Sequence, residues 1–167
     1  MKLENLEKLY LDELKDIYDA EHQILKALPK MAKKAAARDL QRAFEDHQKQ
    51  TEGQVQRLEK VFERLGKKAT RKTCKGVKGL IEEGEEFVKA TGDEDTIDAS
   101  LISAAQRVEH YEMAAYGTLR TYAEILGHDE QARLLQQTLD EEEKTDQRLT
   151  KLAQSGINVQ AAAGRGH

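Results

Sequence analysis

The sequence predicts an all-α protein built from four long amphipathic helices, with a shorter helix between the second and the third. Composition is the first reason: only 5% of the 167 residues are aromatic and 35% are charged. Ala, Leu, Glu, Lys, Arg and Gln dominate, which is typical of long amphipathic helices rather than of a sheet. The second reason is the 3.6-residue spacing of apolar residues over four long stretches. A chain of this length forms one domain around a single core.

The first two helices are predicted from their apolar stripes and their end signals. The first pattern covers residues 6–28, and Pro29, the only proline, is expected to end or kink it, with a brief continuation through Met31. The second pattern covers residues 38–65 and is expected to stop at Gly66, because glycine commonly ends helices.

The second half of the chain predicts a weak helix and two strong ones. Segment 67–94 carries four glycines and few apolar residues, so a short helix flanked by loops is expected there. The third long helix is predicted from near Asp95, which can cap its first turn, to Gly127. The last helix follows a short turn and is expected to end at Gly156.

Connection lengths predict the topology. Short turns make the first two helices one antiparallel hairpin and the last two another. The longer segment 67–94 suits a crossover along a bundle about 40 Å tall, which gives the order up-down-down-up. Residues 1–155, crossover included, are expected to form the bundle, and residues 156–167 a flexible tail.

Charge and hydropathy limit the function classes. The net charge of −4 is mild and the signs are interspersed, so neither nucleic acid nor an anionic membrane is an expected partner. No run of apolar residues is long enough to span a membrane, and the start is too polar for a signal sequence, so a cytoplasmic protein is expected. Residues 64–78 hold seven basic residues and no acid, but they lack aromatic residues for stacking on bases and are more typical of a solvated loop.

Every long helix interrupts its own apolar stripe with a residue that can bind a metal ion. An unpaired ionised carboxylate in an apolar interior costs several kcal/mol, so each buried acid needs a partner, a proton or a metal. The inward candidates are Glu21 on the first helix, His47 and Gln54 on the second, Glu109 and Glu112 on the third, and Glu142 and Asp146 on the last.

Depth along the bundle is a second criterion, because residues facing each other in a hairpin have sequence numbers that average to its turn. The acids of the third and last helices average to the turn near Gly127, so all four are expected at one level. Glu21 and Gln54 average in the same way to the first turn. His47 is expected about one helical turn from Glu21 unless Pro29 shifts the register, so it is the weaker candidate.

Four or five carboxylates at one level repel one another, and no lysine or arginine shares these core positions to neutralise them. Two divalent ions such as iron or manganese would do so, with carboxylates bridging the ions and a histidine or amide completing the shell. The alternative is a metal-free interaction or scaffold bundle, whose inward acids bond to one another with some of them protonated.

Five stretches of the chain resemble the ferritin-like di-iron carboxylate proteins, and within them the YciF/YciE group of bacterial stress proteins. They are DELKDIYDAEHQILKALPKMA, AFEDHQKQTEGQVQRLEKVF, GLIEEGEE, AAQRVEHYEMAAYGTLRTYAEILG and TLDEEEKTDQRL, in order over residues 12–149. The resemblance implies a ferritin-like bundle, a homodimer and a dinuclear metal centre without a well-defined biochemical activity.

By this resemblance Glu21 is the metal ligand of the first helix, Glu109 and Glu112 form the E-x-x-E of the third, and Glu142 is the acid of the fourth. The chain departs from the broader E-x-x-H pattern, because the second helix has no inward acid and Thr145 stands where the fourth helix would carry histidine. The expected site is therefore rich in oxygen ligands and suits iron or manganese. The leading hypothesis is a stress protein that sequesters or oxidises ferrous iron, or removes peroxide.

Overall fold

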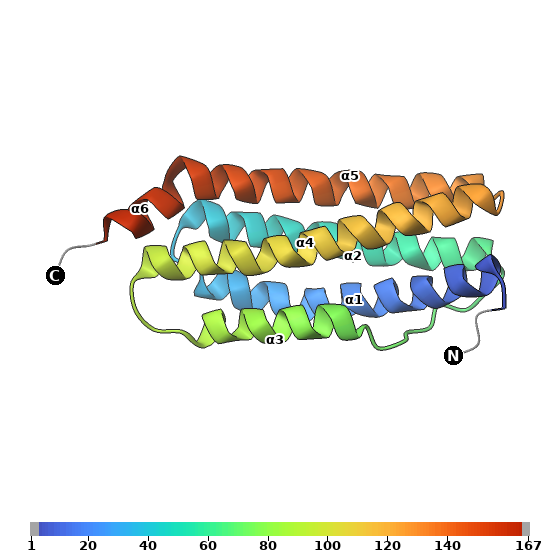
Figure 1. Cartoon of the computed structure of the whole chain (residues 1–167), viewed down its shortest axis with the longest axis horizontal. Helices are drawn as coiled ribbons and strands as arrows, with labels where there is room; N and C mark the ends of the chain where they lie inside the picture. Colours follow the sequence, from blue (N-terminus) through green and yellow to red (C-terminus); the bar gives the residue numbers. More distant parts are fainter. Residues whose placement is uncertain (1–3, 165–167) are drawn as a thin grey trace.

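Four long helices lie side by side in an elongated bundle (Figure 1). The computed structural model describes residues 4–164. The long helices are α1 (Leu6–Lys34), α2 (Arg38–Arg64), α4 (Glu94–Ile125) and α5 (Asp129–Leu152), and α3 (Lys75–Lys89) lies in the connection between α2 and α4. The pairs α1–α2 and α4–α5 are antiparallel hairpins, whereas α2 and α4 run in the same direction (Figure 1). The predicted all-α bundle with the order up-down-down-up is confirmed.

The four long helices enclose one core. α1 and α5 each pack against both α2 and α4, and α3 packs on the outside against α1 and α4 (Figure 1). Each helix contributes one apolar stripe, as the spacing predicts. The largest fully buried side chains include Tyr10, Leu14, Phe44, Phe62, Leu101, Tyr116 and Leu135. No helix within residues 4–164 is long and apolar enough to cross a membrane.

The first helix does not end at Pro29, contrary to one of the two outcomes predicted there, but continues to Lys34. Proline removes one backbone donor from the helix. Leu28, Met31 and Ala32 pack against or within the core on either side of it, and this burial favours continuation of the helix.

Aspartates organise the beginning of α4 and the turn between α1 and α2. Asp93, not Asp95, caps α4, accepting a hydrogen bond of 2.8 Å from the Thr96 amide. Asp98, one turn further along, is buried and accepts hydrogen bonds from the amides of Ala36 and Ala37 at 2.9 and 2.7 Å. Ala37 precedes α2 and has no capping side chain, so Asp98 supplies the cap from another helix.

The chain remains helical beyond the predicted end at Gly156. A π-helical turn (Ala153–Ile157) follows α5 and leads into α6 (Asn158–Ala163), and both pack against α4. Ala153 and Ile157 are buried, and their contacts outweigh the low helix propensity of Gly156. The predicted end of the last helix is therefore wrong. The proposed flexible tail is helical up to Ala163, and its residues 165–167 lie outside the described part of the chain.

Helix α3 is fixed at its beginning by contacts with α1 and α4. The buried Cys74 precedes α3, its sulfur lies 3.2 Å from the hydroxyl of Tyr111, and its amide donates to Asp19 at 2.9 Å. Gly76 lies so close to the Tyr111 ring that a Cβ atom there would be 2.5 Å from Cε2. These contacts hold the crossover helix against the bundle.

Candidate metal centre

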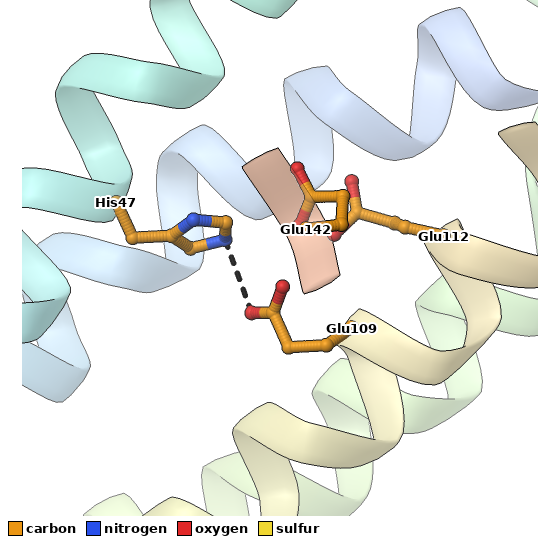
Figure 2. Close-up of side chains that lie close together, drawn as sticks. All are labelled: His47, Glu109, Glu112 and Glu142. Carbon is orange, nitrogen blue, oxygen red and sulfur yellow. Dashed lines mark ion pairs between the residues drawn. The ribbon is translucent and has the colours of Figure 1, made fainter. Parts of the chain in front are cut away.

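Four buried side chains from three helices bring potential metal-binding atoms within 4.8 Å of one another (Figure 2). His47 comes from α2, Glu109 and Glu112 from successive turns of α4, and Glu142 from α5. The spacing of three residues places Glu109 and Glu112 on the same side of their helix, as predicted. Nε2 of His47 lies 3.2 Å from Oε1 of Glu109.

A fourth buried acid, Glu21 of α1, lies beside this group. Glu21, Glu112 and Glu142 are each completely inaccessible to solvent, and Glu109 is 1% exposed. The hydroxyl of Tyr116 donates a hydrogen bond to Glu21. We refer to Glu21, Glu109, Glu112 and Glu142 as the acid cluster.

The acid cluster lacks partners for most of its buried oxygen atoms. Eleven buried side-chain polar atoms in residues 4–164 have no hydrogen-bond partner, and eight of them belong to the acid cluster, His47 and Gln54. The approach of His47 to Glu109 does not have hydrogen-bond geometry, so both histidine nitrogens are among these eight. Buried polar groups are normally satisfied, so these atoms are candidates for binding a cation or for sharing protons with one another.

Electrostatics point in the same direction. Burial, followed by the charge of Glu142, raises the pKa of Glu21 and Glu112 well above the ordinary value for glutamate. Burial and the contact with Glu142 also raise the pKa of Glu109. No lysine or arginine of the described chain forms an ion pair with the acid cluster. Cations bound there would remove this repulsion.

His47 can serve as a neutral ligand. Burial lowers the pKa of its imidazole, which favours the uncharged form that binds metal ions. The register of the α1–α2 hairpin, which pairs positions of α2 with Glu21, predicted that His47 is the weaker candidate. The structure brings it to Glu109 of α4 instead, a contact between hairpins on which turn positions carry no information.

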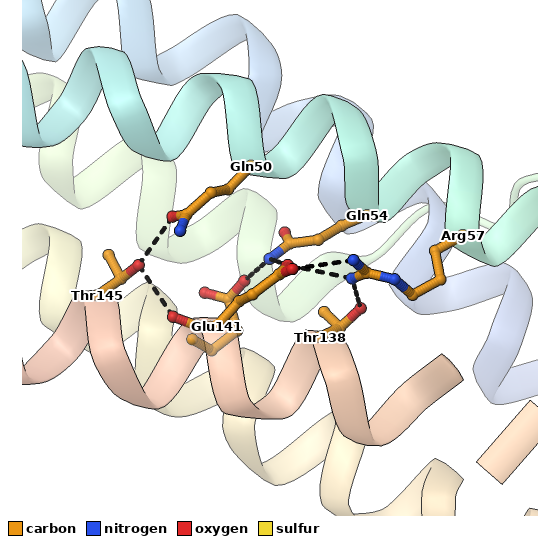
Figure 3. Close-up of polar contacts among 7 residues, drawn as sticks. Gln50, Gln54, Arg57, Thr138, Glu141 and Thr145 are labelled. Atoms are coloured by element: carbon orange, nitrogen blue, oxygen red, sulfur yellow. Dashed lines mark hydrogen bonds and ion pairs between the residues drawn. The ribbon is translucent and has the colours of Figure 1, made fainter. Parts of the chain in front are cut away.

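Gln54 connects the acid cluster to a second layer of polar residues (Figure 3). Its amide nitrogen donates to Glu142 and, at 3.1 Å, to Glu141. Arg57 holds Glu141 with two hydrogen bonds of 2.9 and 3.1 Å and donates another of 2.7 Å to Thr138. This layer lies between α2 and α5 and fixes the orientation of Gln54 (Figure 3).

Sequence reasoning missed Glu141 and Arg57. A signal was present, because Arg57 follows Gln54 by three residues and therefore shares its side of α2. Glu141 has no comparable signal, since it lies beside the apolar stripe of α5 and only the packing of α2 against α5 brings it to Arg57.

Asp146, another predicted ligand, lies apart from both the four-residue group and the acid cluster. Its side chain is 18% exposed, lies 3.2 Å from Nε2 of His110 and accepts a hydrogen bond of 3.1 Å from Gln106. It lies one helical turn beyond Glu142, on the flank of α5 that faces these two residues of α4. From there its charge helps to raise the pKa of Glu109, but its Oδ1 atom lies against His110 and Gln106.

The residues present fit a divalent metal ion. Carboxylates and one imidazole are the donors that iron and manganese accept, and the buried oxygen atoms without partners are free to serve as ligands. A four-helix bundle with such donors on its inner faces is the architecture of ferritin-like proteins. The fold and the site thus place the molecule among the ferritin-like helical bundles with a candidate metal centre.

The chain belongs to the family described as "Domain of unknown function (DUF892)", which residues 5–162 match. It is 43% identical to Protein YciF of Escherichia coli (strain K12) over 162 residues, which is 96% of this chain and 98% of that protein. The predicted resemblance to the YciF/YciE group is confirmed.

Solved structures support the same grouping. The E. coli stress protein YciF matches with a TM-score of 0.90 and 42% identity, covering 94% of this chain and 99% of that one. YcfI from Rhodopseudomonas palustris, described as a candidate structural protein, matches with a TM-score of 0.87 and 43% identity. The match covers 89% of this chain and 95% of that one. A protein from Xanthomonas campestris is only 21% identical, and the match covers 92% of this chain and 93% of that one. Its TM-score of 0.72 shows the shared fold alone.

The basic segment 64–78 is largely balanced by acids of the same chain. Four of its seven basic residues lie in ion pairs, Arg64 with Glu130, Arg71 with Asp19, Lys72 with Asp12 and Lys78 with Glu82. Such pairing leaves less of the segment's positive charge for phosphates.

Proposed function

We propose that this protein is a stress-response protein that binds two divalent metal ions, iron or manganese, in the acid cluster. The observation that carries the proposal is the group of four buried ligand residues, His47, Glu109, Glu112 and Glu142, with ligand atoms within 4.8 Å. Burial raises the pKa of these acids, and no lysine or arginine of residues 4–164 forms an ion pair with them. The similarity to an E. coli protein named a stress protein supports the biological setting.

The ligand residues lie close to one another in the core. His47 and Glu109 lie together on one side of the group, while Glu112 and Glu142 lie next to each other (Figure 2). Glu21 lies near both Glu112 and Glu142, whose charge contributes to its raised pKa. His47, Glu109, Glu112 and Glu142 would hold the ions, with Glu21 beside them as a further ligand.

The surrounding residues hold this set in place and exclude water. Tyr116 orients Glu21 through its hydroxyl, and Gln54 orients Glu142 through its amide. A redox-active divalent ion supplies one-electron chemistry when bound. With such ions the protein would sequester or oxidise ferrous iron, or remove peroxide.

A second candidate function is a metal-free interaction or scaffold bundle. The description of its relative YcfI as a candidate structural protein favours it. So do the hydrogen bonds that Tyr116 and Gln54 already donate to Glu21 and Glu142. In this case the raised pKa values would keep part of the acid cluster protonated, with carboxylic acids donating to carboxylates.

Metal analysis separates the two candidates. We expect protein produced with iron or with manganese to retain about one to two ions per chain after desalting. Glu142→Gln is expected to lose most of the bound metal. Glu143→Gln is the matched control, since Glu143 is the next residue and is exposed, and it should retain the wild-type content. A wild-type protein with almost no metal from either culture refutes metal binding.

The remaining parts of the proposal concern assembly and location. We propose a homodimer in the cytoplasm, which rests on the family resemblance and on the polar, mixed-charge sequence. Sedimentation equilibrium of the full chain gives its mass directly, and a species of 18.9 kDa at all concentrations contradicts the dimer.

A further inference from the structure

An apolar cavity lies between the crossover helix and the acid cluster. Its volume is about 40 Å³, and its walls come from α1, α3 and α4. Ile24 and Leu28 of α1, Leu80 and Gly84 of α3, and Ala105 and Val108 of α4 contribute apolar surface. At its inner end the cavity is lined by His47 and Glu109, two members of the candidate metal centre.

Polar residues mark both ends of the cavity, whereas its walls are apolar. Lys30 of α1 and Glu85 of α3 also line the cavity and form an ion pair of 2.8 Å. Their side chains are 56% and 34% exposed, so this pair marks the end that faces solvent. At the other end the two nitrogens of the buried His47 have no hydrogen-bond partner. The cavity therefore leads from the surface toward one side of the acid cluster.

The size and lining of the cavity define the guest that it suits. A volume of about 40 Å³ is roughly three times what one water molecule requires, so two or three heavy atoms fit. Between the two polar ends the lining is apolar, so a water molecule there finds none of the polar partners that it needs. Along this stretch the two O–H groups of hydrogen peroxide also lack partners, whereas an apolar diatomic molecule needs none.

We infer that this cavity binds a small uncharged apolar molecule of the size of dioxygen and brings it to His47 and Glu109. Binding of such a guest is a property of the cavity alone. Its role as the access route of the oxidant rests on the proposed metal function. As the oxidant for that function, dioxygen fits the cavity better than peroxide does.

Gly84 allows the cavity to be filled by one methyl group. A Cβ atom at Gly84 would touch only Ala104 Cβ, at an ordinary distance of 3.5 Å, with open space elsewhere. Gly79→Ala is the matched control: it makes the same change in α3, meets no atom within 4 Å and does not line the cavity. Both variants raise the helix propensity of α3, so both are expected to fold.

The test uses xenon as an apolar probe in crystals of the full chain under pressure. We expect one xenon site between Leu80 and Val108 in the wild type and in Gly79→Ala, with a several-fold lower occupancy in Gly84→Ala. In solution, dissolved dioxygen should enhance the relaxation of the Val108 methyl protons, and hydrogen peroxide should leave their shifts unchanged. Absence of xenon from the wild-type cavity, equal occupancy in all three proteins, or a shift caused by peroxide overturns the inference.

These readouts do not depend on bound metal. A protein that holds metal but excludes xenon refutes the apolar guest and leaves the proposed function intact. A protein that binds xenon but no metal refutes the proposed function and leaves the apolar guest intact. The metal content of Gly84→Ala is expected to equal that of Gly79→Ala, because Gly84 lies outside the acid cluster.

Discussion

Replacing Glu112 with glutamine should stabilise the metal-free protein. Glu112 is fully buried and neither of its carboxylate oxygens has a hydrogen-bond partner. Burial, together with the charges of Glu142 and Glu21, raises the pKa of Glu112, so holding this carboxyl in the metal-free core costs on the order of several kcal/mol. Glutamine avoids that cost but leaves an amide with incomplete hydrogen bonding, at about 1–3 kcal/mol. The net gain in the free energy of unfolding is about 1–3 kcal/mol. For a chain of this length, each kcal/mol raises the Tm by about 2–4 °C.

The assay is thermal unfolding of chelator-treated wild type, Glu112→Gln and the control Glu143→Gln, each with and without excess Mn²⁺. Metal at a hundred times its Kd stabilises a folded protein by about 2.7 kcal/mol. We expect the wild type and Glu143→Gln to gain stability with Mn²⁺ and Glu112→Gln not to gain. A lower Tm for metal-free Glu112→Gln would refute the idea that the buried carboxyl is destabilising. An equal gain with Mn²⁺ in all three proteins would refute the role of Glu112 as a ligand.

Three further predictions follow from pH, a remote cap and a close helix contact. The raised pKa values of the acid cluster mean that the folded state binds more protons than the unfolded chain above about pH 4.5. Metal-free protein should therefore be more stable at pH 5.5 than at 7.5 in urea unfolding, even though the single lowered pKa of His47 acts in the opposite direction. Equal stability at pH 5.5 and pH 7.5 would contradict this prediction. Asp98→Asn weakens two hydrogen bonds to the backbone between α1 and α2, and it should lower the free energy of unfolding by about 1–3 kcal/mol. An unchanged urea midpoint would show that these hydrogen bonds do not stabilise the fold. Gly76→Ala should cost about 1–3 kcal/mol of stability, because its Cβ would lie 2.5 Å from the Tyr111 ring. Gly79→Ala, whose Cβ would lie in open space, should stabilise the protein. Equal melting temperatures of the two variants would contradict the contact.

The helices were predictable where local signals and core contacts agree. The stops near Gly66 and Gly127 are confirmed, because both glycines adopt positive φ, at 64° and 76°. Pro29 and Gly156 carry equally strong local signals for an end, yet the chain remains helical through both. At these two positions burial of the flanking residues outweighs local propensity, and no single-sequence pattern reports the size of that burial.

The candidate site shows the same division. Periodicity placed Glu21, Glu109, Glu112 and Glu142 on inner faces, and all four are buried. It also placed Asp146 there, but this side chain is partly exposed and contacts Gln106 and His110 instead.

The sequence by itself determined the number of long helices, their order and the side of each helix that carries acids. These properties follow from the 3.6-residue period and from the lengths of the connections, which act within one helix or between neighbours in the chain. Only the tertiary structure decided that His47 meets Glu109, that Asp98 caps α2 and that α3 covers an apolar cavity. Each of these depends on the packing of one hairpin or of the crossover helix against another part of the bundle. That packing is set by the shapes of many side chains together and not by the spacing of residues along any one helix.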